Sequence, residues 1–456
     1  MRLPQKHRIP CFLPIFLFLL AGGVFGQQRA KIRGYITARP DEKTIMIMDD
    51  AILFGPGIGF QMQDAPPGKQ LTAADLTVAT MIEAEGVWTG KHQFTADKIK
   101  CDWDQLDKQI REHAYLEREP AQSAELIGGQ PCQLRADGEV LVIDENTKRE
   151  WHGRAQMKAP DAPVWLGRQI RYSGRRRPDG TMAVQSIEIG ALPPADAYET
   201  PGKRKLVRAQ DAKTGIDILE FRKDKKVEGR FKLFPVRDVQ EYVSALGTKL
   251  IPPAAQNPPM SDIEFRFYVV EDSTANAASL PDGSIMLNTG LLGLIENEAQ
   301  LAFVLSHETA HVLQAHYWRQ ENETRTKRVL ISIGAAAASA YVGNVAVFLG
   351  QLGLAAVANG YARRLENQAD RLALENVVEH GYDPGQAIGL LRMMVSRYSD
   401  RSTSATWSNH DSSMLRGSFL TVQIGLRYPR QEFKKATVDS DTFRAMRENM
   451  GPVKIM

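Results

Sequence analysis

Three residues in the stretch LAFVLSHETAHVLQAH have the types and spacing needed to hold and use a metal ion. His307 and His311 are four residues apart, so on an α-helix both imidazoles lie on one face, one turn apart. Two imidazole nitrogens at this spacing can bind one zinc ion at about 2.0–2.1 Å. Glu308 is rotated by about 100° from His307, so it is suited to reach a metal-bound water and move its protons. The pattern alone also fits an apolar-faced helix that carries two histidines by chance.

A third ligand must come from elsewhere, because a hydrolytic zinc site has three protein ligands and one open position. The stretch YARRLENQAD offers Glu366 and Asp370, four residues apart on a strongly patterned helix. Glu366 is the candidate ligand. Asp370 can accept a hydrogen bond from the far nitrogen of a ligand histidine and so fix its tautomer. Taken alone, the two acids also fit an ordinary charged helix face.

His316 is a poor third ligand by its position. A metzincin would have glycine at position 314 and histidine at position 317, where this chain has Gln314 and Tyr317. His316 comes one residue too early for that pattern. We therefore interpret His316 as a surface residue at the end of the helix.

The segment 236–384 resembles the M48 family of zinc metallopeptidases, which includes CAAX-prenyl proteases, the heat-shock membrane protease HtpX and periplasmic quality-control peptidases. The similarity is carried, in chain order, by FYVVED, NAASLPDGSIMLNTGLL, NEAQLAFVLSHETAHVLQAH, YARRLENQAD and HGYDPGQA. The resemblance implies one Zn²⁺ per chain and polypeptide substrates. It implies the zinc ligands His307, His311 and Glu366, the base Glu308, and Asp370 as the hydrogen-bond partner of a ligand.

The chain departs from the family pattern in a later loop. Family members often carry Thr-His-Pro there, whereas this chain has Asn409-His410-Asp411. We expect His410 to approach the zinc or to stabilise the oxyanion of the tetrahedral intermediate, with an exposed loop histidine as the alternative. The segment GSIMLN (283–288) is expected to be an edge strand along which an extended substrate binds through backbone hydrogen bonds.

The first 26 residues have the layout of a secretory signal peptide. A basic head precedes an apolar run over residues 9–25, and Gly26 is the expected cleavage point. The alternative is an uncleaved membrane anchor, because this run is near the lower limit for crossing a bilayer. The sequence therefore predicts an exported protein of the periplasm or cell envelope. In such a compartment Cys101 and Cys132 can form a disulfide, or they can be two unrelated buried residues.

The region before the peptidase-like segment reads as β-rich. TIMIMDD is matched by EVLVIDE, Trp88-Thr89-Gly90 by Tyr172-Ser173-Gly174, and FTADKIKC by MAVQSIEI. This loose two-fold repeat predicts two β modules, residues 27–115 and 125–195, either as small β-barrels or as one continuous β domain.

The remaining boundaries follow from changes in composition. Residues 196–235 are rich in Pro, Lys and Arg and predict a linker with a hairpin. Residues 236–430 predict an α+β peptidase domain, mainly helical with a small edge sheet, and 431–456 a C-terminal tail. The charge-free run 329–361 allows two helical arms of about 22 Å, shorter than the bilayer core of about 30 Å. We expect these arms to pack in the domain or against a membrane surface.

The chain has 456 residues and a net charge of +3, too small to indicate a nucleic-acid partner, and it has no basic stripe with interleaved aromatic residues. The sequence therefore predicts an exported zinc metalloendopeptidase that acts on misfolded or unassembled envelope proteins. The alternative is a chaperone-like or binding protein with a structural or occluded metal site. Nothing in the sequence indicates an oligomeric state.

Overall fold

The computed structural model describes residues 29–102, 109–115, 129–136, 139–151, 169–177, 179–190, 195–256, 260–325, 361–398, 413–428 and 430–455. These residues form four β-sheets and a set of helices, so the α+β class is confirmed. The expected signal peptide, the charge-free run up to residue 360, and His410 lie outside the described residues.

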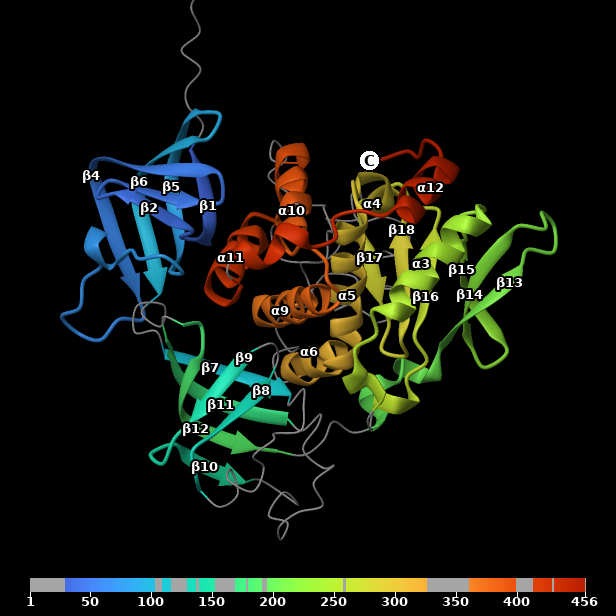
Figure 1. Cartoon of the computed structure of the whole chain (residues 1–456), viewed down its shortest axis with the longest axis horizontal. Helices are drawn as coiled ribbons and strands as arrows, with labels where there is room; N and C mark the ends of the chain where they lie inside the picture. The colour runs from blue at the N-terminus through green and yellow to red at the C-terminus, as the bar shows by residue number, and fades with distance from the viewer. Residues whose placement is uncertain are drawn as a thin grey trace, which may run out of the picture.

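The first sheet has six strands in the order β1-β5-β6-β4-β3-β2 (Figure 1). Only β4 and β6 run parallel. The two end strands do not pair with each other in the described part of the chain, so the sheet is an open half-barrel around an apolar core. The strands are β1 (Ala30–Tyr35), β2 (Ala38–Asp41), β3 (Thr44–Ile47), β4 (Asp50–Gln63), β5 (Met81–Gly90) and β6 (Gln93–Asp102).

The second sheet repeats the pairings of the first. β7 pairs with β11 as β1 does with β5, β11 with β12 as β5 does with β6, and β8 with β9 as β3 does with β4. β9 and β10 both run parallel to β12, as the two halves of β4 do to β6, which supports the predicted two-fold repeat. The strands are β7 (Gln109–Tyr115), β8 (Cys132–Ala136), β9 (Glu139–Ile143), β10 (Lys148–Trp151), β11 (Gln169–Arg176) and β12 (Met182–Ile189).

The repeat has a different register from the one read in the sequence. Both sheets shift register at a glycine, Gly86 in β5 and Gly174 in β11, where a Cβ atom would clash with the neighbouring strand's backbone. EVLVIDE corresponds to residues 50–56, so its match to TIMIMDD is wrong by six residues. Tyr172-Ser173-Gly174 corresponds to residues 84–86, so the match to Trp88-Thr89-Gly90 is wrong by four residues. Both tripeptides lie in strands rather than turns.

One further expectation for this region is wrong, and one alternative that the sequence left open is decided. The first module was expected to extend to residue 115, but β7 pairs with β11 and belongs to the second sheet. Cys101 and Cys132 are buried in different sheets and both are free thiols, so no disulfide joins the modules. Each cysteine instead fills an apolar core.

Residues 205–232 form a three-stranded antiparallel sheet instead of a linker with one hairpin. Its strands are β13 (Lys205–Gln210), β14 (Asp217–Lys223) and β15 (Lys226–Lys232). The buried side chains of this sheet include Leu206, Leu219 and Phe221. They pack in one cluster with Met286 and Tyr317. Burial of these apolar side chains holds the segment against residues 236–430, the expected peptidase domain. This domain, together with the C-terminal residues that follow it, is called the peptidase region below.

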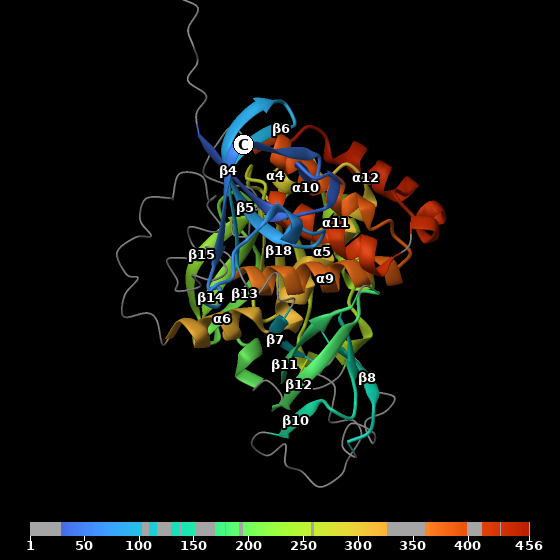
Figure 2. The same cartoon turned by 90° about the vertical axis from the view of Figure 1, so that its left-hand side faces the viewer.

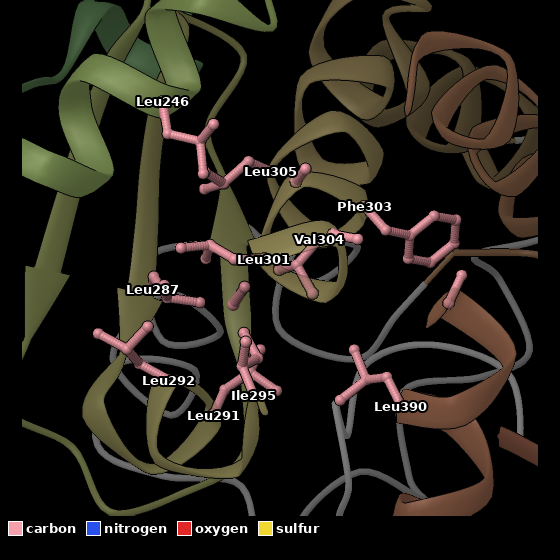
Figure 3. Close-up of a cluster of buried hydrophobic side chains, with 14 of the residues drawn as sticks. Leu246, Leu287, Leu291, Leu292, Ile295, Leu301, Phe303, Val304, Leu305 and Leu390 are labelled. Carbon is pink, nitrogen blue, oxygen red and sulfur yellow. The ribbon is translucent and has the colours of Figure 1, made fainter. Parts of the chain in front are cut away.

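The peptidase region contains a short mixed sheet, β16 (Arg266–Val270), β18 (Ser284–Asn288) and β17 (Ala277–Ser279), in that spatial order. The segment expected at the edge is thus the central strand, β18, because β16 pairs with one side of it and β17 with the other. Helix α5 (Glu298–Leu313) lies against this sheet. Figure 3 shows its leucines facing the side chains of α3 (Arg237–Lys249), α4 (Thr289–Leu294) and β18.

Five further helices of this region lie in the described residues. They are α6 (His316–Arg325), α9 (Arg363–Glu379), α10 (Gly385–Tyr398), α11 (Ser413–Arg427) and α12 (Asp441–Met450). Ser440 caps α12, which buries Phe443 and Met446 in the core of the region, so 431–456 is not a free tail. Within the described residues, no helix is both long and apolar enough to cross a membrane.

Both β modules lie against α9 and α11, as Figures 1 and 2 show. In the first module, the backbone N–H of Tyr35 donates to Ser418 Oγ on α11 at 2.9 Å, and Asn367 of α9 donates to the Tyr35 hydroxyl at 3.2 Å. In the second module, Glu139 forms ion pairs with Arg371 of α9 and Arg427 of α11. The modules therefore support α9, which carries Glu366 and Asp370, and its neighbour α11.

Candidate active site

Helix α5 presents the two histidines to the interior of the peptidase region. Asn297 caps its start by accepting a hydrogen bond from the N–H of Gln300 at 3.0 Å, and every residue of the helix is buried. The Nε2 atoms of His307 and His311 lie 3.0 Å apart. The predicted one-turn spacing therefore directs both imidazoles to the same point.

Helix α9 packs against α5 and brings Glu366 to this point. Its carboxylate oxygens lie 3.5 Å from His307 Nε2 and 3.6 Å from His311 Nε2. Ligand atoms around a tetrahedral zinc ion, each about 2.0–2.1 Å from the metal, are about 3.3 Å from one another. The three residues are completely or almost completely buried, and their geometry fits one zinc ion.

Asp370 fixes the tautomer of His307. One carboxylate oxygen of Asp370 lies 3.0 Å from His307 Nδ1, so this nitrogen carries the proton and donates it. Buried Arg416 of α11 donates to both oxygens of Asp370, at 2.7 and 3.0 Å, and its Nη2 is 3.3 Å from His307 Nδ1. Burial alone would raise the pKa of Asp370, but Arg416 and His307 outweigh burial and hold that pKa below its ordinary value.

His316 is buried, so its interpretation as a surface residue is wrong. The chain leaves α5 at Gln314, and Ala315 has a positive φ of 49°, which turns the start of α6 back toward α5. His316 Nδ1 then lies 2.8 Å from His311 Nδ1, and His316 Nε2 lies 3.1 Å from Gln368 Oε1. Burial and the nearby charge of Arg319 lower the pKa of His316 well below its ordinary value.

The donor set itself indicates a cation. His307 carries its proton on Nδ1, so its Nε2 atom presents a lone pair to His311 and to the carboxylate of Glu366. Glu366 is completely buried with these rings. A buried cluster of electron-pair donors is costly unless it is paired with positive charge, and a metal ion would provide this.

Glu308 lies beside the cluster and is held by the sheet. Ser279 of edge strand β17 donates its hydroxyl to Glu308 Oε2 at 2.9 Å. Tyr361 stacks on His311, with ring centroids 4.3 Å apart. A small pocket lies between β17 and this tyrosine, and it is lined by Ala197, Ser279, Leu280, Pro281, His311, Val312, Ala315, Tyr317 and Tyr361.

The structure brings together five of the six predicted site residues: His307, Glu308, His311, Glu366 and Asp370. The sixth, His410, lies outside the described residues.

Sequence reasoning missed Ser279, Gln368 and Arg416. Arg416 had one detectable signal, since it is a charged residue within the apolar pattern of MLRGSFL. Ser279 and Gln368 had none, because their partners are distant in the chain.

Comparison with known proteins agrees with this geometry. Residues 238–423 match the profile of Peptidase family M48. Over 181 residues the chain is 30% identical to "Mitochondrial metalloendopeptidase OMA1" of Schizosaccharomyces pombe, a match that covers 40% of this chain and 51% of that protein. It is 28% identical over 169 residues to "Beta-barrel assembly-enhancing protease" of Escherichia coli, covering 35% of this chain and 34% of that protein.

The matched regions thus span about half and about a third of these two relatives. Residues 238–423 include α5 and α9, the two helices that carry the His-His-Glu cluster. They also include most of α11, with Arg416. Residues 238–423 of this chain are therefore similar to the peptidase domain of family M48.

Proposed function

We propose that this protein is an exported zinc metalloendopeptidase. His307, His311 and Glu366 would hold the metal, and Asp370 would orient the first of them. Zinc bound there would act as a Lewis acid. It would polarise the scissile carbonyl and make a bound water molecule a stronger acid. The observation that carries the proposal is the convergence of three ligand atoms, one from each of these residues, which all lie within 4.8 Å of one another in a buried site.

Glu308 is the proton carrier in this proposal. It follows His307 directly, and so it projects from a different side of α5 than the two histidines. As a carboxylate it takes a proton from the attacking water and passes it to the leaving amine. The hydroxyl of Ser279 donates to one oxygen of Glu308 at 2.9 Å, which holds the carboxylate in place beside His307.

Strand β17 is the proposed binding edge for the substrate backbone. In the described residues it pairs with β18 on one side only, and it carries Ser279 beside Glu308. A polypeptide that extends the sheet along β17 would pass the candidate metal site with its backbone held by hydrogen bonds. Backbone recognition favours unfolded segments over a particular sequence.

The substrates and the location are part of the same proposal. We propose misfolded or unassembled envelope proteins as substrates, consistent with the names of the relatives, a metalloendopeptidase and an assembly-enhancing protease. The apolar N-terminal stretch supports export by a signal peptide cleaved near Gly26. N-terminal sequencing of the protein from fractionated cells tests this part: a start near Gln27 supports export, and an intact N-terminus in the membrane fraction contradicts cleavage.

The catalytic part is tested by metal analysis together with cleavage of unfolded casein. We expect one zinc per chain in the wild type and in Glu308→Gln, with cleavage in the wild type alone. General acid–base groups contribute about 10²–10⁴-fold, so the variant should lose at least a hundredfold in rate. Full zinc without cleavage of any unfolded protein by the wild type would favour the alternative, a binding protein with a structural metal.

A further inference from the structure

The two candidate histidine ligands differ in what their second nitrogen contacts. Nδ1 of His307 faces the carboxylate of Asp370, whereas Nδ1 of His311 lies 2.8 Å from Nδ1 of another imidazole, that of His316. A hydrogen bond between two ring nitrogens needs one donor and one acceptor. The direction of this bond therefore decides which nitrogen of His311 carries the proton and which presents a lone pair.

Gln368 sets the direction of that bond. Arg319 has only donors, and its Nη1 lies 2.7 Å from the side-chain atom assigned as Gln368 Oε1, so this atom must be the oxygen. The amide nitrogen of Gln368 agrees with this assignment, because it donates to Gln314 Oε1 at 3.1 Å. His316 Nε2 lies 3.1 Å from the same Gln368 oxygen, so this nitrogen must be the donor.

His316 must then be an acceptor at its other nitrogen. A neutral imidazole carries one N–H, and here that N–H points to Gln368. His316 is completely buried, and Arg319 donates to the same Gln368 oxygen, so a charged imidazolium there would be a buried cation beside a second cation. His311 therefore donates from Nδ1, and its Nε2 lone pair faces His307 Nε2 and the carboxylate of Glu366.

We infer that His316 is a positioning residue that, with Gln368, holds His311 in the tautomer whose Nε2 can bind the metal. The inference deepens the proposed function and rests on the zinc site proposed there. His316 acts on the proposed zinc site through its contact with the ring of His311. Groups that orient a ligand in this way typically contribute about 10–100-fold to metal affinity.

Two substitutions at the same position separate this role from simple packing. The Oδ1 atom of asparagine stands near the place of the imidazole Nδ1, so His316→Asn keeps an acceptor for His311. The amide of glutamine reaches the place of Nε2, so His316→Gln keeps the contact to Gln368 but removes that acceptor. Both variants lose the ring, and a purely structural role predicts equal effects.

The experiment measures zinc affinity of the purified full-length protein by competition with a chromophoric chelator, and the visible absorption of the cobalt-substituted protein. We expect His316→Gln to bind zinc about 10–100-fold more weakly than the wild type, with an altered cobalt spectrum. His316→Asn should stay close to the wild type in both. Circular dichroism of the metal-free proteins compares their folding.

Equal zinc affinities in the two variants, or weaker binding by His316→Asn, would overturn the inference while leaving the zinc site intact. A wild type that binds no zinc would overturn the proposed function as well. If both variants at position 316 unfold, Gln368→Glu and Gln368→Met provide the same comparison. The glutamate keeps an acceptor for His316 and should retain zinc affinity, whereas methionine removes it and should weaken binding. Equal affinities in this second pair would also refute the inference.

Discussion

The buried carboxylate of Glu139 provides a quantitative test of how the second β module is attached to the peptidase domain. It is completely buried in β9. Arg176 of its own sheet donates to both of its oxygens at 2.8 Å, while Arg427 of α11 lies at 2.8 Å and Arg371 of α9 at 3.3 Å. Glu139→Gln keeps the shape of the side chain but leaves three guanidinium groups around a neutral amide. Removing one partner of a buried ion pair typically costs about 3–5 kcal/mol, and we expect a loss of that size in the free energy of unfolding at pH 7.

The effect should also depend on pH. Burial opposes the charge of Glu139, but Arg176, Arg427 and Arg371 outweigh burial and hold its pKa well below the ordinary value. A lowered pKa in the folded state stabilises the protein fully above the pKa of the unfolded state, about 4.3 for glutamate, and less as the pH falls toward the folded value. The difference between wild type and Glu139→Gln should therefore be constant from about pH 5 to pH 8 and shrink below about pH 4.

Urea unfolding followed by circular dichroism at about pH 7 and about pH 3 measures both expectations. The matched control is Glu145→Gln, an exposed acid on the same module, which should stay within about 0.5 kcal/mol of the wild type. A loss of less than about 1 kcal/mol for Glu139→Gln at pH 7 would refute the reasoning, because the buried charge would then contribute no more than a surface ion pair.

Three further outcomes follow from the described contacts. Arg416→Met leaves the buried carboxylate of Asp370 without its cation and should weaken zinc binding by about 10–100-fold, measured by chelator competition; unchanged affinity would contradict the orienting role. Ser279→Ala removes one charge-assisted hydrogen bond to the proposed base, worth about 1.5–3 kcal/mol, so kcat on casein should fall at least about tenfold at unchanged zinc content. Cys101 and Cys132 should both react with a thiol reagent in urea without reductant, and fewer than two reactive thiols from this pair would indicate a disulfide. In the folded protein Cys101 should react slowly, because burial raises the pKa of its thiol to about 12.

The residues of the candidate site were predictable where the rule that positions them is local. His307 and His311 share a helix face because of their four-residue spacing, and so do Glu366 and Asp370. The contact between α5 and α9 could not be predicted from the local sequence of either helix. Its prediction came from the resemblance to a family, and the structure agrees by packing α5 against α9.

The errors have identifiable physical causes. His316 was assigned to the surface because a continuous helix was assumed, whereas the chain breaks at Ala315 with a positive φ that alanine rarely adopts. The prediction of GSIMLN (283–288) as an edge strand is wrong, because the central or edge position of a strand depends on partners that its own residues do not specify.

The C-terminal helix shows the opposite case. Ser440 precedes Phe443, Met446 and Met450, which is a helix cap followed by apolar residues at helical spacing, so α12 was readable from the sequence. The prediction of a C-terminal tail missed this pattern. The core position of α12 became evident only with α3, against which it packs.

The most direct test of the central claim is anomalous X-ray diffraction at the zinc edge from crystals of the purified protein. The site described above predicts one strong peak at about 2.0–2.2 Å from His307 Nε2, His311 Nε2 and a carboxylate oxygen of Glu366. The peak should be lost or strongly reduced in crystals of Glu366→Ala. A peak bound by other residues, or none in a protein that cleaves casein, would contradict the assignment of these three side chains.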